Sequence, residues 1–267
     1  MKATGSNQYR RQLGLISTRR PVKQPPAVSP SSPARCRAVP SHPISRQLAA
    51  DDPECPAELL DRLADDPNAQ IRFGVASNPA TSPATLTKLS GAREPWVLSQ
   101  VAGNPHTSPK ILTKLSGTND SLILSRIASN PSAPPVVLAA LAGLPTPGEP
   151  ARRTQNPALS LDIRSRVAGN PSAPTWLLQQ LSRDTHITVR RAVAENPRAP
   201  ADILVQLAQD PELHVRIGVA GNLRTPSEVL CRFLSDSNLL LREAAAANPN
   251  LPQATLAMWQ LTRDQPT

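Results

Sequence analysis

The side chains of this sequence that could carry out acid–base, nucleophilic or metal chemistry follow no common pattern. The histidines are His42, His106, His186 and His214. None of them has a cysteine or carboxylate at a spacing typical of metal ligands. The sequence also contains no glycine-rich phosphate loop and no nucleophile motif. It therefore predicts a protein that is not an enzyme and that holds no metal and no cofactor.

The cysteines, Cys36, Cys55 and Cys231, are odd in number and lie far apart. Such usage argues against a disulfide framework and fits a reducing compartment. No apolar stretch approaches the ~20 residues of a membrane span, and none resembles the core of a secretory signal. We therefore expect a soluble, cytoplasmic protein without a membrane span.

The charged side chains that do recur are arginines, and most of them follow an aspartate by six residues. The pairs are Asp66 and Arg72, Asp184 and Arg190, Asp210 and Arg216, and Asp236 and Arg242. Where leucine replaces the arginine, at Leu98 and Leu124, the aspartate is missing too. Arg164, with Ala158 in place of the aspartate, is the exception. Because the two residue types come and go together, they predict a structural ladder of ion pairs and helix caps between stacked units, rather than a ligand-binding row of arginines.

These residues recur because the chain is built from a repeated unit of 26 residues. One anchor residue marks each unit, and it is asparagine in every unit but the first. The anchors are Asp52, Asn78, Asn104, Asn130, Asn170, Asn196, Asn222 and Asn248. Every interval is 26 residues except that from Asn130 to Asn170, which is 40 and therefore contains 14 inserted residues. A period in this range is typical of solenoid proteins.

Each unit is predicted to hold two short helices. A leucine stands eight residues after every anchor, and Leu, Phe or Trp stands three residues further, as in the buried stripe of a helix. Apolar residues seven and three before the anchor, such as Val189 and Val193, form the stripe of the other helix. Prolines keep both helices short, and the anchor asparagine is predicted to bridge backbone groups at its own turn. The fold class is therefore all-α, an α-solenoid of about eight two-helix units.

The repeated elements resemble those of the leucine-rich repeat variant family. The shared elements are Asn-Pro, Leu-x-x-Leu, Asp-Pro and Val-Arg-x-x-Val-Ala, which recur in fixed order over about residues 47 to 260. The resemblance implies a right-handed superhelix in which α-helices alternate with 3₁₀-helices. Some members of the family carry a [4Fe–4S] centre in a cysteine cluster before the repeats. Four thiolates are usual for such a centre, and only Cys36 and Cys55 lie near this end of the chain, so we expect no iron–sulfur cluster.

The chain is predicted to divide into a tail and a solenoid. Residues 1–46, rich in proline and serine, are predicted to be disordered. Residues 1–50 hold nine Lys/Arg and no Asp/Glu, so the net charge of +9 arises in this segment. Residues 47–260 are predicted to form the solenoid, with a loop insertion at about 143–157, and residues 261–267 a second tail.

Two surfaces are candidates for binding a partner. Trp96, Leu98, Leu122 and Leu124 occupy positions that are polar or charged in most units, and stacking predicts that they form an exposed apolar patch. The alternative is that these side chains pack locally or under the tail. The second candidate surrounds the insertion and comprises Val136, Arg152, Arg153 and Trp176, although a tolerated insertion would explain it equally well.

The sequence favours a non-enzymatic scaffold that binds another protein. The main alternative is a nucleic-acid-associated protein that uses the basic tail and a row formed by Arg62, Lys88 and Lys114. A solenoid enzyme is a further alternative, because some α-solenoids are DNA glycosylases or bilin lyases. The acid-free tail also matches an organelle transit peptide, or a segment passed through a bacterial injection apparatus into a host cell.

Overall fold

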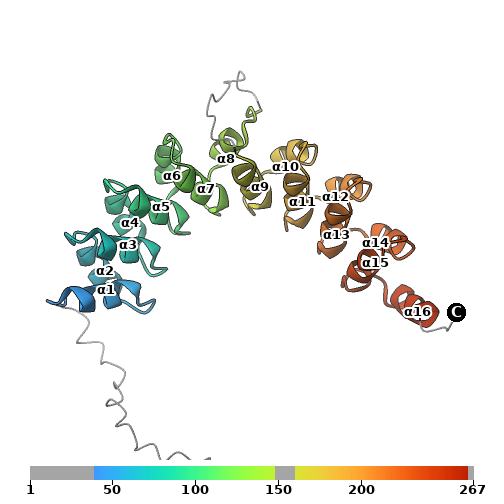
Figure 1. The fold of residues 1–267 in the computed structure, drawn as a ribbon, viewed down its shortest axis with the longest axis horizontal. Coiled ribbons are helices and arrows are strands. Elements are labelled where there is room, and N and C mark those ends of the chain that lie inside the picture. The colour runs from blue at the N-terminus through green and yellow to red at the C-terminus, as the bar shows by residue number, and fades with distance from the viewer. Residues whose placement is uncertain (1–38, 148–159, 264–267) are drawn as a thin grey trace, which may run out of the picture. The chain divides into compact units, whose positions relative to one another are not determined.

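The computed structural model describes residues 39–147 and 160–263 of the 267-residue chain, and these residues form sixteen α-helices and no strand (Figure 1). The odd-numbered helices precede the anchors and are α1 (Pro43–Asp51), α3 (Ala69–Ser77), α5 (Pro95–Gly103), α7 (Ser121–Ser129), α9 (Leu161–Gly169), α11 (Ile187–Glu195), α13 (Leu213–Gly221) and α15 (Leu239–Ala246). The even-numbered helices follow the anchors and are α2 (Ala57–Leu63), α4 (Pro83–Leu89), α6 (Pro109–Leu115), α8 (Pro135–Ala142), α10 (Thr175–Leu181), α12 (Ala201–Leu207), α14 (Ser227–Phe233) and α16 (Gln253–Arg263).

The helices form two rows. Successive odd-numbered helices pack on one another, from α1 on α3 through to α13 on α15, whereas the even-numbered helices pack mainly on the odd-numbered helices beside them. Figure 1 shows the two rows following each other along the array. Each unit therefore contributes one helix to each row, and the predicted all-α solenoid is confirmed.

Local chemistry explains where the helices begin and end. Ser82 accepts a hydrogen bond from the main-chain N–H of Thr85 at 3.1 Å, and Pro83 occupies the first helical position, where its missing N–H costs nothing. The odd-numbered helix α11 ends at Glu195. The next residue, Asn196, is its C-terminal cap, and its backbone is extended (φ −66°, ψ 125°) because a proline follows it. The prolines thus limit each helix to a length that is marginal in isolation.

Both kinds of helix are α-helices in the described residues, so the alternation with 3₁₀-helices that the family resemblance implied is not found there. At the start of α2, the N–H of Leu60 donates to the carbonyl of Pro56 at 3.1 Å, which is an α-type bond. A 3₁₀-type bond, from Leu59 N–H to the same carbonyl at 2.9 Å, occurs beside it. A helix of seven residues already has room for α-type bonds, and the tighter bonds are confined to its ends.

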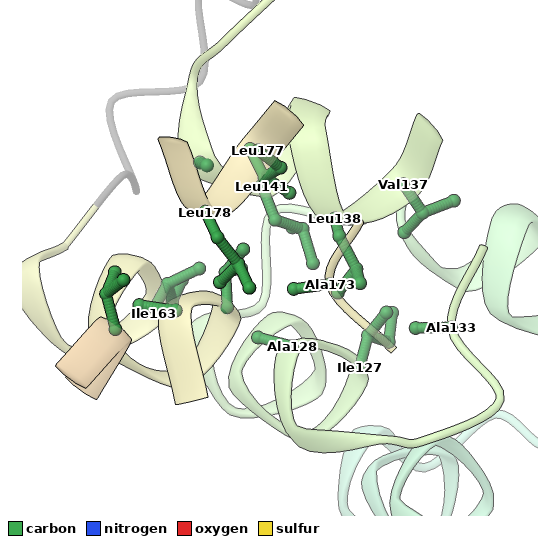
Figure 2. Close-up of a cluster of buried hydrophobic side chains, with 14 of the residues drawn as sticks. Ile127, Ala128, Ala133, Val137, Leu138, Leu141, Ile163, Ala173, Leu177 and Leu178 are labelled. Atoms are coloured by element: carbon green, nitrogen blue, oxygen red, sulfur yellow. The ribbon is translucent and has the colours of Figure 1, made fainter. Parts of the chain in front are cut away.

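One continuous apolar core runs between the two rows. The leucine eight residues after the anchor is fully buried in the first seven units, from Leu60 to Leu230. Figure 2 shows the core at the middle of the array, where Ile127, Leu138, Ile163 and Leu178 meet from four different helices. Each such side chain contributes about 1.5 to 3 kcal/mol to stability when buried. Because these faces are covered only by neighbouring units, no unit has a complete core of its own.

The anchor asparagines join each unit to the one before it. Asn196 donates from Nδ2 to the carbonyls of Ala168 at 2.7 Å and Asn170 at 2.9 Å, while its Oδ1 accepts from the N–H of Arg198 at 2.8 Å. The same three bonds occur at the other six anchor asparagines, which are Asn78, Asn104, Asn130, Asn170, Asn222 and Asn248. All seven side chains are buried. The predicted local bridge is therefore one of the three bonds, and the other two join neighbouring units.

The insertion does not interrupt this ladder. Asn170 donates to Ala128 and Asn130, which precede it by 42 and 40 residues, instead of the usual 28 and 26. The 14 extra residues are thus accommodated between α8 and α9, while α7 and α9 still stack in register. Gly143, with a left-handed backbone (φ 71°), ends α8 and begins this connection.

The array extends slightly beyond the limits predicted from the sequence. Helix α1 begins at Pro43, behind a His42 cap, and α16 continues to Arg263. Most of the predicted N-terminal tail, the core of the insertion and the last four residues lie outside the described residues.

We predict that Asn196→Ala lowers the free energy of unfolding by about 2 to 4 kcal/mol, because it removes three buried hydrogen bonds, two of them to carbonyls of the preceding unit. Urea denaturation followed by circular dichroism measures this loss. Asp52→Ala is the matched control, because it changes the equivalent position where only one local bond, to the N–H of Glu54, is made. It should cost about 1 kcal/mol or less. Equal losses in the two variants would contradict the role of the bonds between units.

Candidate interaction surface

The recurring arginines contact the aspartates of their own unit through the main chain. Nη1 of Arg190 donates to the carbonyl of Asp184 at 2.9 Å and to that of Thr185 at 3.2 Å. Arg72, Arg216 and Arg242 make the same bond to the aspartate carbonyl, at 2.6 to 2.8 Å. Each of these arginines thereby holds the loop that leads into its own helix.

Three of the four aspartate carboxylates pair instead with the arginine of the preceding unit. Arg190 contacts both carboxylate oxygens of Asp210, from Nε at 2.7 Å and from Nη2 at 3.0 Å. Two further pairs of this kind are Arg46 with Asp66 at 2.6 Å and Arg164 with Asp184 at 3.0 Å. The spacing of 20 residues between partners identifies these pairs, and it explains why Arg164 is kept although its own unit has Ala158.

Glu94 serves as a substitute in a unit that has lost its aspartate. Ala92 occupies the aspartate position there, and Glu94, two residues later, accepts from Arg72 at 2.7 Å. The hydrogen bond from Arg72 lowers the pKa of Glu94 below its ordinary value. The link between α3 and α5 is thus preserved with a different acid.

The Arg190–Asp210 pair makes the stability of the protein depend on pH in the acidic range. Burial raises the pKa of Asp210. The hydrogen bonds from Arg190 and from the N–H of Glu212, together with the arginine charge, lower it by more, so the pKa lies below its ordinary value. The bond from Asp210 raises the pKa of Arg190 in turn. Asp210 Oδ1 also accepts from Glu212 N–H at 3.0 Å, which caps the loop before α13.

The histidines take part in backbone contacts at separate places. His42 Nδ1 accepts from the N–H of Ile44 at 3.3 Å, and His106 Nδ1 lies 3.4 Å from the carbonyl of Thr81. His186 is the N-terminal cap residue of α11. Within residues 39–147 and 160–263, no three His, Cys, Asp or Glu side chains gather in a way that could hold a metal ion.

The predicted patch of four apolar residues is only partly exposed. Leu124 is 1% exposed and belongs to the core, and Leu98 is half-buried against it, so these two residues are a correction to the prediction. The physical reason is that leucine, unlike the arginine of other units, has no polar group that favours the loop or the solvent, and it packs on the core. Trp96 and Leu122 remain exposed, at 37% and 50%.

A residue that the sequence analysis missed completes this surface. The ring of Phe73 lies 5.5 Å from that of Trp96 at an angle of 44° and is half-buried. Phe73, Trp96 and Leu122 lie on α3, α5 and α7, three successive helices of one row, and we call them the apolar patch. Phe73 differs from the smaller or polar residues at its position in most units, and that signal could have identified it.

The residues around the insertion are only partly described. Val136 is 48% exposed at the start of α8, and Trp176 is half-buried against the core in α10. Arg152 and Arg153 lie outside the described residues. The two described residues therefore offer one exposed apolar side chain.

The predicted basic row is engaged with acidic and carbonyl groups. Lys88 lies 2.6 Å from the carboxylate of Asp65, and its Nζ donates to the carbonyl of Asp61 at 3.0 Å. Lys114 donates to the carbonyl of Ser90 at 3.4 Å. Both lysines thereby link their helix to the preceding unit.

No helix among the described residues is long and apolar enough to cross a membrane.

Eight two-helix units on one continuous core, joined by buried asparagines, define an α-solenoid repeat protein. Residues 187–212, one period of the repeat, match the family model "Leucine rich repeat variant". The other units share the anchor and leucine positions of that segment, so the whole array is built from units similar to the one that matches this family model.

A solved structure described as "a leucine-rich repeat variant with a novel repetitive protein structural motif" is 23% identical, with 72% of this chain and 71% of that chain covered and a TM-score of 0.45. No curated protein matches the sequence.

We predict that Asp210→Asn lowers stability at neutral pH by about 1 to 3 kcal/mol, because it removes a charge-assisted pair. Since the folded pKa of Asp210 is depressed, the native protein gains stability above the unfolded pKa of about 3.9 and loses it as pH falls through the lower folded value. The variant should therefore lose less stability than the native protein on acidification below about pH 4. Thermal unfolding at several pH values measures this, with the exposed Asp202→Asn as control. Parallel acid profiles of Asp210→Asn and the native protein would contradict the assignment.

Proposed function

We propose that this protein is a non-enzymatic scaffold that binds another protein through the apolar patch of Phe73, Trp96 and Leu122. The observation that supports this most strongly is the exposure of Trp96 and Leu122 on neighbouring helices of a rigid array. Tryptophan is among the residues that contribute most to protein–protein affinity. The patch is therefore the best candidate anchor for a partner.

The surroundings of the patch fit a protein interface. Gln100 and Arg126 follow Trp96 and Leu122 by four residues and so lie beside them on the same helices. They provide a polar rim around an apolar centre, which is the usual anatomy of such interfaces. Because α3, α5 and α7 pack on one another and are joined by the asparagine ladder, the patch is preorganised, and binding costs little ordering.

The recurring charged residues support a scaffold rather than an enzyme. The arginines and aspartates at the repeated positions hold loops and join units, so their pattern is accounted for by folding. The lysines of the basic row likewise contact the preceding unit. The exposed side chains of Trp96 and Leu122 are apolar, whereas most other units have polar residues at that position. Exposed apolar side chains favour contact with a protein.

We predict that Trp96→Ala with Leu122→Ala weakens binding of the partner at least about tenfold, because the change removes the anchors of the interface. The full chain is immobilised, proteins bound from a cell extract are eluted with steps of salt, and the affinity of the identified protein is measured for each variant. Val205→Ala with Leu223→Ala is the control, since these exposed apolar residues lie outside the patch.

The proposed function is supported if one protein stays bound at high salt and is lost only from the patch variant. Undiminished binding to the patch variant, with unchanged helical content, contradicts the role of the patch. Elution of nucleic acid at modest salt as the main ligand contradicts the scaffold itself, since phosphate contacts weaken steeply as salt rises.

A further inference from the structure

The first anchor of the array differs chemically from the other seven. Asp52 has the backbone role of an anchor, because its carbonyl accepts from Nδ2 of Asn78 at 2.7 Å. Its side chain is exposed and accepts one local bond, from the N–H of Glu54 at 2.9 Å. The asparagines at the equivalent positions are buried and donate two bonds to the preceding unit. A carboxylate has no hydrogen to donate, so Asp52 cannot make those bonds.

The last described unit has the groups that a further anchor would contact. In every earlier unit, the carbonyls two residues before the anchor and at the anchor itself accept from the next asparagine. The corresponding groups of the last unit are the carbonyls of Ala246 and Asn248. The adjacent core positions, Leu256 and Trp259, are only half-buried there, and Met258 and Leu261 are each 69% exposed.

The shapes of the two ends are also compatible. Within the array, a residue four before an anchor packs over the residue one before the preceding anchor, and at Gly74, Gly103 and Gly218 a large side chain meets a glycine there. The Cδ of Arg126, for example, lies 3.2 Å from where a side chain on Gly103 would begin. Conversely, Gly74 lies against Asp51. At the ends, Leu48 holds the first of these positions and is 66% exposed, while Ala247 holds the second. Leu48 over Ala247 is the same large-on-small combination.

We propose that Asp52 is a stop residue, which prevents a second copy of this chain from stacking its last unit onto the first unit in continuation of the array. In that arrangement the Asp52 carboxylate would face the carbonyl oxygens of Ala246 and Asn248 of the second copy. A charge buried against acceptors without a partner is strongly unfavourable. Since the two ends use different surfaces, stacking would be head-to-tail and would continue into chains or rings of copies. The inference concerns the ends of the array and does not rest on the proposed function.

The test is sedimentation velocity of the full chain and of Asp52→Asn over a range of concentrations. The variant carries both missing donors, and its self-association constant should exceed that of the native protein by about tenfold or more. Asp51→Asn removes the same charge one residue away, at a position that makes no bond to a preceding unit, and it should behave as the native protein. Asp52→Ala removes the charge without adding donors and should associate less than Asp52→Asn.

A second change identifies the surface that is used. Adding Ala247→Glu to Asp52→Asn places a large charged side chain where Leu48 of the second copy would pack, and it should return the protein to a monomer. Circular dichroism confirms that each variant keeps its helical content. The proposal is overturned if Asp52→Asn stays monomeric, if Asp51→Asn associates equally, if the native protein already forms chains, or if Ala247→Glu leaves the association unchanged.

Discussion

The structure depends on the bonds that an asparagine side chain makes to the unit before its own. Helices of seven to eleven residues are marginal alone, and here they pack on their neighbours. Apolar packing supplies most of the stabilisation, but it does not define a register between short helices. The buried asparagine does, because its amide must find two carbonyls and an N–H at fixed positions. This constraint explains how α7 and α9 remain stacked across 14 inserted residues.

The charged residues form a second set of connections outside the core. Each arginine of the repeat holds its own loop by the main chain, and at several units it also reaches the carboxylate of the next unit. The substitution of Glu94 for the missing aspartate shows that this link can be made with different residues. Where arginine itself is missing, leucine packs inward, and the surface nearby becomes apolar. Loss of the charged link and gain of the apolar patch are therefore parts of one local change.

The architecture was predictable because its determinants recur at a fixed spacing. Leucines, prolines and anchors in register define both helices and their ends without knowledge of the packing. The partners of the asparagines and aspartates were not predictable in the same way, because they lie in the preceding unit or in the main chain. The exposure of Leu98 and Leu124 was wrongly predicted, since a position that is polar in other units does not stay at the surface when its polar partner is lost. Phe73 was missed because its contact with Trp96 crosses between units.

Hydrogen exchange of the asparagine side-chain amides tests the central claim most directly. In a protein labelled with ¹⁵N at asparagine, NMR resolves the amide protons of the seven anchors from those of exposed residues such as Asn68 and Asn119. If the anchors join the units, their amides exchange slowly, at rates like those of the buried backbone, because exchange requires neighbouring units to separate. Anchor amides that exchange as fast as Asn68 and Asn119, in a protein that keeps its helices, would contradict the account.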